Sequence, residues 1–276
     1  MCATAGLGFK LQHLDAALAA TAPGLWFEVH AENYMVDGGP RLAALTELRE
    51  RHPISVHGVG LSLASPAPPP DGHLRRLKAL ADRVQPFLVS DHLAWQKWGG
   101  VHHSDFLPFP RTRAALQIVI ANVDRVQTAL GRTILVENPS LYVDLPGHEF
   151  SEVEFLGALA KATGCGLILD VNNLFVSAHN LGFNSRTALD AIEPEMIKEI
   201  HMAGHSRDAD PSSPLLIDTH GADIAAPVWD LFRHLIARIG PRPTLIERDD
   251  DVPAFDLLMR ERGRADALLN RAYALV

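Results

Sequence analysis

The stretch that decides the fold is GLILDVNN, residues 166–173. Its apolar first half predicts a strand buried on both faces. The second half instead delivers a carboxylate, Asp170, and two carboxamides, Asn172 and Asn173. A loop cap would explain one such polar ending. Similar endings recur along the chain, so the pattern predicts a feature shared by the whole fold.

Short β-rich runs alternate with segments whose apolar residues are spaced by three and four, which predicts repeated strand–helix units. The helical segments include residues 74–84, 114–130, 228–239 and 255–269. The predicted strands are GLGFK (6–10), LWFEVH (25–30), ISVHGVG (54–60), FLVSDHLAW (87–95), TILVENP (133–139), GLILDVNN (166–173), IKEIHMAGH (197–205) and PTLIERD (243–249).

Strands that are apolar on both faces and alternate with helices pair in parallel through βαβ units. Eight such units in 276 residues predict an α/β fold, a closed (β/α)₈ TIM barrel, as a single domain over residues 1–276. An open doubly wound sheet is the alternative, but no G-x-G-x-x-G follows the first strand. We expect the Pro-rich segment 64–72 and the long segments 170–186 and 206–223 to be βα loops at the C-terminal face.

Composition limits the function. A formal net charge of −8 argues against a large basic surface for nucleic acid. Only Cys2 and Cys165 are present, which excludes a disulfide framework and a thiolate zinc site. No apolar run approaches a membrane span, and no secretory signal is evident, so we expect a cytoplasmic protein.

Nitrogen and oxygen donors stand at or just after the predicted strand ends. In a barrel these ends converge on one cavity. Each residue alone has an ordinary structural explanation, such as a hydrogen-bonded histidine or a loop cap, but these explanations would all have to hold at once. The nine donors are His57, His92, Glu137, Asp170, Asn173, His201, Asp218, His220 and Glu247.

The donor set predicts a metal centre. Carboxylates without nearby cations would repel one another and raise each other's pKa, and a divalent metal removes this cost. Imidazoles with carboxylates suit iron, zinc or manganese. Nine ligands exceed what one ion accepts while keeping a position open for substrate, so we expect two or three ions.

Other polar residues near the same face are weaker candidates for contacts with substrate or for supporting a ligand. Histidines 13, 52, 73, 148 and 234 are expected on the solvated surface. Residues 248–251 are expected to form a solvated acidic loop, although one of its carboxylates could orient a ligand. No nucleophile elbow or Walker A loop is present. The weaker candidates for substrate contacts or for supporting a ligand are His30, Glu32, Asn33, His103, His179 and His205.

The phrases WFEVHAENY, SVHGVGLSL, SDHLAW, LVENPS, LDVNNLFVSAHN, IHMAGH and LLIDTH together resemble the multinuclear non-heme iron-dependent oxidative enzymes. This group contains the enzymes of methanobactin and bufferin biosynthesis. The order of donors also resembles the wider endonuclease IV and xylose-isomerase-like TIM barrels. The resemblance covers nearly the whole chain and rests on the combination of motifs.

The resemblance implies how the donors divide. His57, His92 and Glu137 would hold one iron, with Glu137 bridging to a second iron bound by Asp170, His201 and Glu247. Asn173, Asp218 and His220 would hold a third, where endonuclease IV has a histidine in place of the asparagine. Glu137, Asp170 and Glu247 would thus serve the catalytic pair of irons, in mixed Fe(II)/Fe(III) form.

The resemblance also implies an activity. Such an enzyme would use O₂ as co-substrate to modify cysteines of a ribosomally synthesised precursor peptide, forming an oxazolone–thioamide or a thiooxazole, as in copper-binding natural products. A small partner protein that recognises the precursor would form a heterodimer with it. No nucleic-acid or membrane partner is expected.

Two other classes of function stay open at this level. A hydrolase or isomerase of the endonuclease IV or xylose isomerase type would use divalent metal without O₂ chemistry. The negative charge disfavours a DNA substrate, and no strand-end lysine supports sugar isomerisation. A non-enzymatic metal-binding protein would take up metal without consuming O₂.

Overall fold

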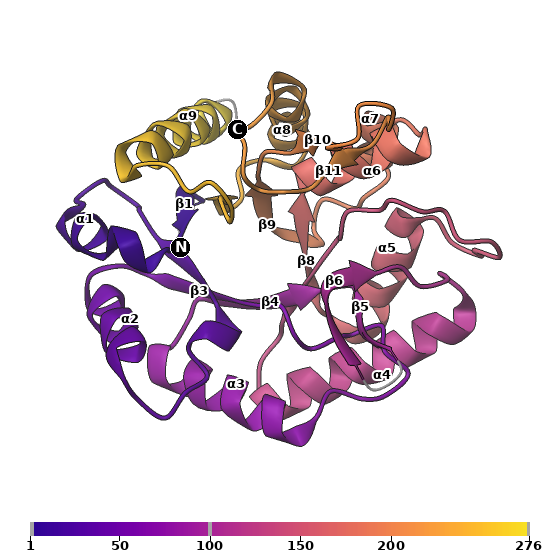
Figure 1. Cartoon of the computed structure of the whole chain (residues 1–276), viewed down its shortest axis with the longest axis horizontal. Coiled ribbons are helices and arrows are strands. Elements are labelled where there is room, and N and C mark those ends of the chain that lie inside the picture. The colour runs from indigo at the N-terminus through magenta and orange to yellow at the C-terminus, as the bar shows by residue number, and fades with distance from the viewer. Residues whose placement is uncertain (1–2, 99–100, 275–276) are drawn as a thin grey trace.

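A computed structural model describes residues 3–98 and 101–274, and its central element is a closed barrel of parallel strands (Figure 1). The order β1-β12-β9-β8-β7-β4-β3-β2 closes because β1 pairs with both β12 and β2. The predicted TIM barrel is therefore confirmed. The barrel strands are β1 (Ala5–Gly8), β2 (Phe27–His30), β3 (Ile54–Gly58), β4 (Leu88–His92), β7 (Leu135–Glu137), β8 (Gly166–Asp170), β9 (Ile197–Met202) and β12 (Thr244–Ile246).

Helices surround the barrel, and their apolar faces cover the outward-facing side chains of the strands (Figure 1). Thr112 caps α4, and Ser151 with Glu154 forms a capping box at α5, so both helices begin at sequence-encoded signals. None of the described helices has the length and hydropathy to cross a bilayer. The α-helices are α1 (Leu14–Ala19), α2 (Pro40–Arg51), α3 (Asp71–Val84), α4 (Arg113–Leu130), α5 (Glu152–Thr163), α6 (Val171–Leu181), α7 (Ser185–Asp190), α8 (Ala226–Ile239) and α9 (Phe255–Tyr273).

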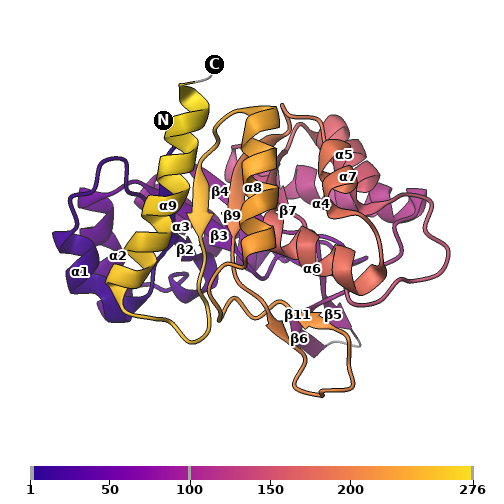
Figure 2. The same ribbon diagram turned by 90° about the horizontal axis from the view of Figure 1, so that it is seen from above.

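Two small antiparallel hairpins stand at one end of the barrel, opposite the chain termini (Figure 2). One joins β5 (Trp95–Trp98) to β6 (Val101–Leu107), and the other joins β10 (Ser206–Arg207) to β11 (Leu216–Ile217). The strand predicted at residues 87–95 combined β4 with the first residue of the first hairpin. The sequence pattern also assigned the second hairpin to a loop, because two-residue strands carry no periodic signal.

The segment after β8 is a helix, α6, and the expected long loop at 170–186 is wrong. Asp170 caps this helix, since its Oδ1 accepts the Asn173 backbone N–H at 2.6 Å. Gly182 ends it with φ +74°, a left-handed conformation that favours glycine. The polar residues that predicted a loop lie on the buried first turn, where the barrel mouth supplies them with partners.

Side-chain alternation along the strands separates an outer apolar core from a polar interior. Val56 and Val136 are buried in the apolar core between the strands and the helices. The residues that follow them, His57 and Glu137, are also buried but are polar and belong to the interior of the barrel. The register places His92 beside Glu137 and Asp170 beside His201 on neighbouring strands. The barrel therefore collects the polar strand ends inside its C-terminal mouth.

Candidate metal centre

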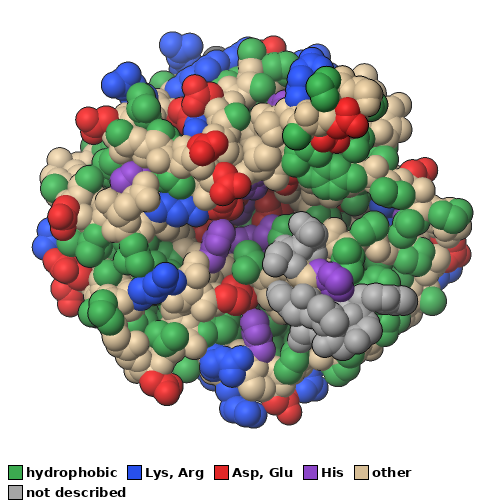
Figure 3. Space-filling view, viewed as in Figure 1, with side chains coloured by type: hydrophobic (Ala, Val, Ile, Leu, Met, Phe, Trp, Pro, Cys, Tyr) green, Lys and Arg blue, Asp and Glu red, His purple; other side chains and the backbone are tan. Residues whose placement is uncertain are grey.

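Five side chains at the strand ends form what we call the floor cluster: His57, His92, Glu137, Asp170 and His201. All five are buried, and each comes from a different barrel strand, β3, β4, β7, β8 or β9. Ligand atoms of the first three lie within 4.8 Å of one another, and so do ligand atoms of the last three. Figure 3 shows histidine and acidic side chains gathered in a hollow near the centre of this face. The structure thus brings these sequence-predicted residues together in two overlapping triads.

Glu137 belongs to both triads through different oxygens. Its Oε2 lies 3.2 Å from His57 Nε2 and 3.5 Å from His92 Nε2. Its Oε1 lies 3.3 Å from His201 Nδ1. A carboxylate that offers one oxygen to each of two imidazole groups has the geometry of a ligand shared by two cations.

Several polar atoms of the floor cluster have no hydrogen bond among the described residues. Both oxygens of Glu137, Oδ2 of Asp170 and both ring nitrogens of His201 are buried in this state. Buried polar atoms without partners cost roughly 1–3 kcal/mol each, so such a concentration needs a ligand to offset it. Divalent cations such as iron, zinc or manganese fit this mixed imidazole and carboxylate set.

Glu247 joins the floor cluster to a second group at the mouth. Its Oε2 lies 3.4 Å from both His201 Nδ1 and His220 Nδ1. With Asp170 and His220 it forms a further group of convergent ligand atoms. We call the outer residues the rim cluster, which consists of His30, Asp218, His220 and Asp249.

The rim cluster is paired within itself. His220 Nε2 lies 2.8 Å from Asp218 Oδ1, and its Nδ1 lies 3.6 Å from Asp249 Oδ2. His220 has φ +48°, a left-handed conformation uncommon for a residue with a side chain, so the loop bends sharply to turn its ring inward. Asp249 is exposed, as expected of a solvated loop, and its carboxylate also contacts His220 and His30.

Asn173, expected beside Asp218 and His220, is hydrogen-bonded elsewhere. Its Oδ1 accepts from Ser140 Oγ at 2.9 Å, and its Nδ2 donates to the Asn138 carbonyl at 3.0 Å. The neighbouring carboxamide reaches the rim instead, since Asn172 Nδ2 donates to Asp218 Oδ1 at 2.7 Å. Both residues lie on the first turn of α6, where consecutive side chains point in different directions.

Charge in the floor cluster follows from burial. Burial lowers the pKa of His57 well below its ordinary value, and the nearby His92 lowers it further. Burial likewise lowers the pKa of His92. Burial raises the pKa of Asp170 well above its ordinary value, opposed by His220 and reinforced by Glu137. His57 and His92 are thus held in the neutral form that binds metal.

Glu247 and the two imidazoles beside it show the opposite balance. Burial alone would lower the pKa of His201, but Glu137 and Glu28 raise it well above its ordinary value. His220 behaves likewise beside Asp218 and Glu247. Burial alone would raise the pKa of Glu247, yet His220 and His201 hold it well below its ordinary value. In the protein alone these groups neutralise one another.

Two buried carboxylates near His201 were not predicted from the sequence as site residues. Glu28 Oε1 and Glu199 Oε1 lie 3.7 and 3.9 Å from His201 Nε2, and the three residues form another convergent group. Burial raises the pKa of Glu199 well above its ordinary value, and the nearby Glu28 raises it further. A signal did exist: Glu28 and Glu199 stand two residues before His30 and His201, and a spacing of two places side chains on the same strand face.

Among the weaker candidates from the second strand and the first hairpin, His30 alone reaches the centre. Its Nε2 lies 3.6 Å from Glu247 Oε1. Glu32 instead accepts from the Val59 backbone N–H and lies 3.4 Å from His73 Nε2. Asn33 is exposed, and His103 lies on β6 with its Nε2 buried and without a hydrogen bond among the described residues.

The remaining candidates lie around the second hairpin. His179, on α6, contacts the Pro214 carbonyl through Nε2 at 2.9 Å. His205 contacts Asn172 Oδ1 through Nδ1 at 2.7 Å and so supports Asp218 indirectly. Two surface expectations are wrong: His52 is buried against the Ala17 carbonyl, and Arg248 is buried beside Asp223 and Glu261.

Comparison with known proteins gives a family match over almost the whole chain. The sequence model of a family described as "RiPP precursor modification enzyme MbnB/TglH/ChrH" matches residues 4–270. A UPF0276 protein of Caulobacter vibrioides (strain NA1000 / CB15N) is 61% identical over 269 residues, which cover 98% of this chain and 96% of the relative. A UPF0276 protein of Paraburkholderia phytofirmans is 47% identical over 270 residues, with coverage of 98% and 86%.

Solved structures similar to this chain are TIM barrels. Endonuclease IV from Thermus thermophilus aligns with a TM-score of 0.60 and 16% identity, covering 99% of this chain and all of that one (100%). A D-psicose 3-epimerase aligns with a TM-score of 0.57 and 10% identity, with coverage of 99% and 97%. At these identities the likeness extends to the xylose-isomerase-like fold and no further.

Proposed function

This chain belongs to the MbnB/TglH/ChrH family of RiPP precursor modification enzymes, and from that membership we propose that it is an O₂-dependent multinuclear iron oxidase. Its substrate would be a cysteine-containing precursor peptide, and its product an oxazolone–thioamide or a thiooxazole. A small partner protein would recognise the precursor. The observation that carries the proposal is Glu137, whose two unpartnered oxygens face two different sets of imidazoles.

The residues that would hold the irons follow from the two triads. His57, His92 and Glu137 would bind one ion, and Glu137, Asp170 and His201 would bind a second with help from Glu247. His220, Asp218 and Glu247 would bind a third ion nearer the mouth. Asn173 is the weakest of the proposed ligands, because its carboxamide is already hydrogen-bonded.

Iron bound here would supply redox chemistry and an open coordination position for O₂ and the substrate thiolate. The chain's own residues fix the ligands. With His57 bound through Nε2, its Nδ1–H donates to Ser90 Oγ at 2.7 Å, which holds the ring and its tautomer. The Phe106 ring lies against His92 with centroids 4.0 Å apart, so it excludes water from that side.

Metal content measured together with activity tests this proposal. Protein purified without O₂ and loaded with ferrous iron should bind two or three ions per chain. On admission of O₂ it should change the mass of a cysteine peptide, whereas the Glu137→Gln variant should leave that mass unchanged.

Two results would contradict the proposal. One is a protein that binds no iron. The other is an iron-loaded protein that leaves a panel of cysteine peptides unchanged under O₂. Zinc binding with cleavage of an abasic DNA duplex would instead favour the endonuclease-type alternative.

A further inference from the structure

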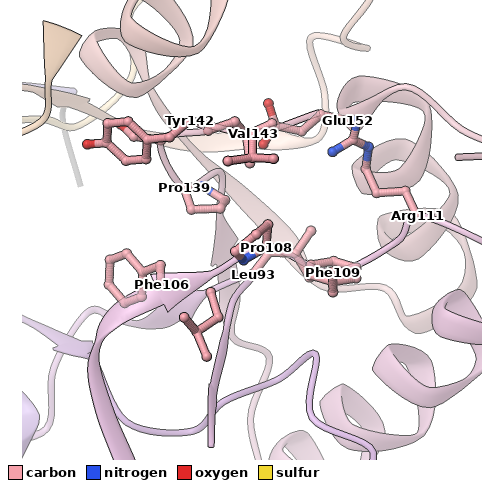
Figure 4. A pocket seen from close by; sticks show the side chains of 12 residues that line it. Leu93, Phe106, Pro108, Phe109, Arg111, Pro139, Tyr142, Val143 and Glu152 are labelled. Carbon is pink, nitrogen blue, oxygen red and sulfur yellow. The ribbon is translucent and has the colours of Figure 1, made fainter. Parts of the chain in front are cut away.

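An apolar groove, which we call the side groove, is lined by the side chains drawn in Figure 4. Its cavity volume is about 60 Å³. One wall comes from β6 and the segment before α4, and the other comes from the loop between β7 and α5. Its main lining residues are Leu93, Phe106, Phe109, Pro139, Leu141 and Val143.

The side groove adjoins the proposed iron site. Phe106 lines the groove, and its ring also lies against His92 of the floor cluster. Leu93 directly follows His92, and Ser140, on the opposite wall, donates to Asn173. A molecule that lies in the groove is therefore separated from the metal ligands by single side chains.

The groove exposes apolar surface that a folded chain normally covers. Val143 is 55% exposed and Tyr142 is 36% exposed, and both line it. A second hollow shares Arg111, Leu141 and Glu152 with the groove and exposes Phe183. Contiguous exposed apolar surface next to a reactive site is typical of a ligand-binding surface.

The charged residues of the groove favour a neutral occupant. Burial raises the pKa of Glu152 to about 7, partly offset by Arg111. In Figure 4 Glu152 and Arg111 lie beside each other at one end of the groove, away from Phe106. No lysine, and no charged residue other than this pair, is among the described lining residues, so the groove attracts an apolar side chain more than a charged one.

We propose that the side groove binds an apolar side chain of the peptide substrate, a few residues from the residue that reacts at the metals. This proposal rests on the peptide substrate of the proposed function and names the sequence feature that the enzyme selects. In an extended peptide each residue advances roughly 3.3–3.6 Å, and alternate side chains share a face. A leucine, isoleucine, valine, methionine or phenylalanine near the reacting residue in sequence would thus be a candidate for the groove.

The test measures peptide binding without turnover. The probes are fluorescein-labelled decapeptides with one central cysteine in a serine and glycine background, in which a single leucine is moved through the other positions. Anisotropy titrations use the iron-loaded full chain under argon. The variant is Val143→Glu, and the matched control is Val36→Glu, since Val36 is 49% exposed and lines a different hollow.

Leucine at one or two positions should tighten binding about tenfold over the leucine-free peptide, the effect of burying one large aliphatic side chain. Val143→Glu should abolish this gain, and Val36→Glu should retain it. If leucine gives no gain at any position, or if the gain survives Val143→Glu, the proposal is overturned. The groove would then suit another occupant, such as a partner protein.

The same peptides separate this proposal from the proposed function. Admission of O₂ and mass spectrometry then report modification independently of binding. A leucine preference that depends on Val143, without any mass change under O₂, supports the groove and contradicts the oxidase. Modification without a leucine preference does the reverse.

Discussion

The floor and rim clusters use the same chemical groups but support them differently. Floor residues project from barrel strands, and their polar atoms largely lack partners among the described residues. Asp218, His220 and Asp249 of the rim lie on loops, are partly exposed, and already form ion pairs with one another. Strand-borne ligands are preorganised, and they hold buried polar atoms that a bound cation would satisfy. Loop-borne ligands are more exposed to solvent, so we expect an ion held there to be more labile.

The largest effect should come from Glu137→Gln, which removes the carboxylate shared by both floor triads. Both floor ions should be lost on dialysis, with affinity reduced by more than about 100-fold, beyond the loss typical of residues that only support ligands. Inductively coupled plasma mass spectrometry would count the ions. The control is Glu152→Gln, an equally isosteric change at a buried carboxyl outside the centre. Retention of both ions would show that Glu137 is not shared.

His220→Ala should remove the rim ion alone, because the floor ligands lie on other elements. The metal count should fall by one ion, and the floor ions should stay after dialysis. His234→Ala on α8 is the control, since His234 pairs with Asp190 outside the centre. If the floor ions also leave, the two clusters are one cooperative unit and the comparison between them fails.

Glu199→Gln should weaken, but not abolish, the ion at His201. The carboxyl group that faces His201 Nε2 is replaced by a carboxamide, and comparable changes near a ligand cost about 10–100-fold in metal affinity. Competition with a chelator at increasing metal concentration would measure the shift, with exposed Glu195→Gln as control. Unchanged affinity would assign Glu199 a purely structural role.

Glu152 shows how a buried carboxyl outside the metal centre affects stability. Its folded-state pKa of about 7 exceeds the ordinary 4.5, so the folded protein loses stability as pH rises through this window. Glu152→Gln cannot ionise, so its stability relative to the parent should rise by at most about 3 kcal/mol between pH 4 and pH 8. Urea unfolding at both pH values measures this gain, and the metal content should not change. A gain that depends on metal would contradict the separation of Glu152 from the centre.

Substitution of the two carboxamides on the first turn of α6 should change the metal content only slightly. Asn172→Ala removes the donor to Asp218 and should weaken only the rim ion, by several-fold. Asn173→Ala removes two buried hydrogen bonds and should lower stability by about 1–3 kcal/mol while leaving the metal count unchanged. If instead Asn173→Ala alone costs the rim ion, Asn173 is a ligand after all.

The sequence was sufficient for the barrel and for the five floor residues near the ends of its strands. Apolar runs ending in histidine or carboxylate defined β3, β4, β7, β8 and β9, and parallel pairing alone brings such endings together. His57, His92, Glu137, Asp170 and His201 follow from that logic.

The contacts of loop residues and the start of α6 could not be predicted from the apolar pattern of the strands. Asn172 and Asn173 are adjacent, and which of them faces Asp218 depends on where α6 begins. That start is set by the Asp170 cap, which competes with a loop in the sequence pattern. Asp249 and Arg248 looked like a solvated charged run because their partners lie far away in sequence. Glu28 and Glu199 were not predicted because they lie inside their strands, whereas the prediction considered the polar residues at the strand ends.

The two roles of Asp170 limit which substitutions can occur at this position during evolution. One of its oxygens begins α6 and the other faces the metal centre. Substitution by serine or asparagine would preserve a helix cap but remove the charge, and substitution by glutamate would preserve the charge but displace the cap. A descendant of this sequence therefore cannot adjust the start of that helix and the charge at the metals separately. Variation in this part of the barrel should fall on the rim loops, where Asp218, His220 and Asp249 cap no helix.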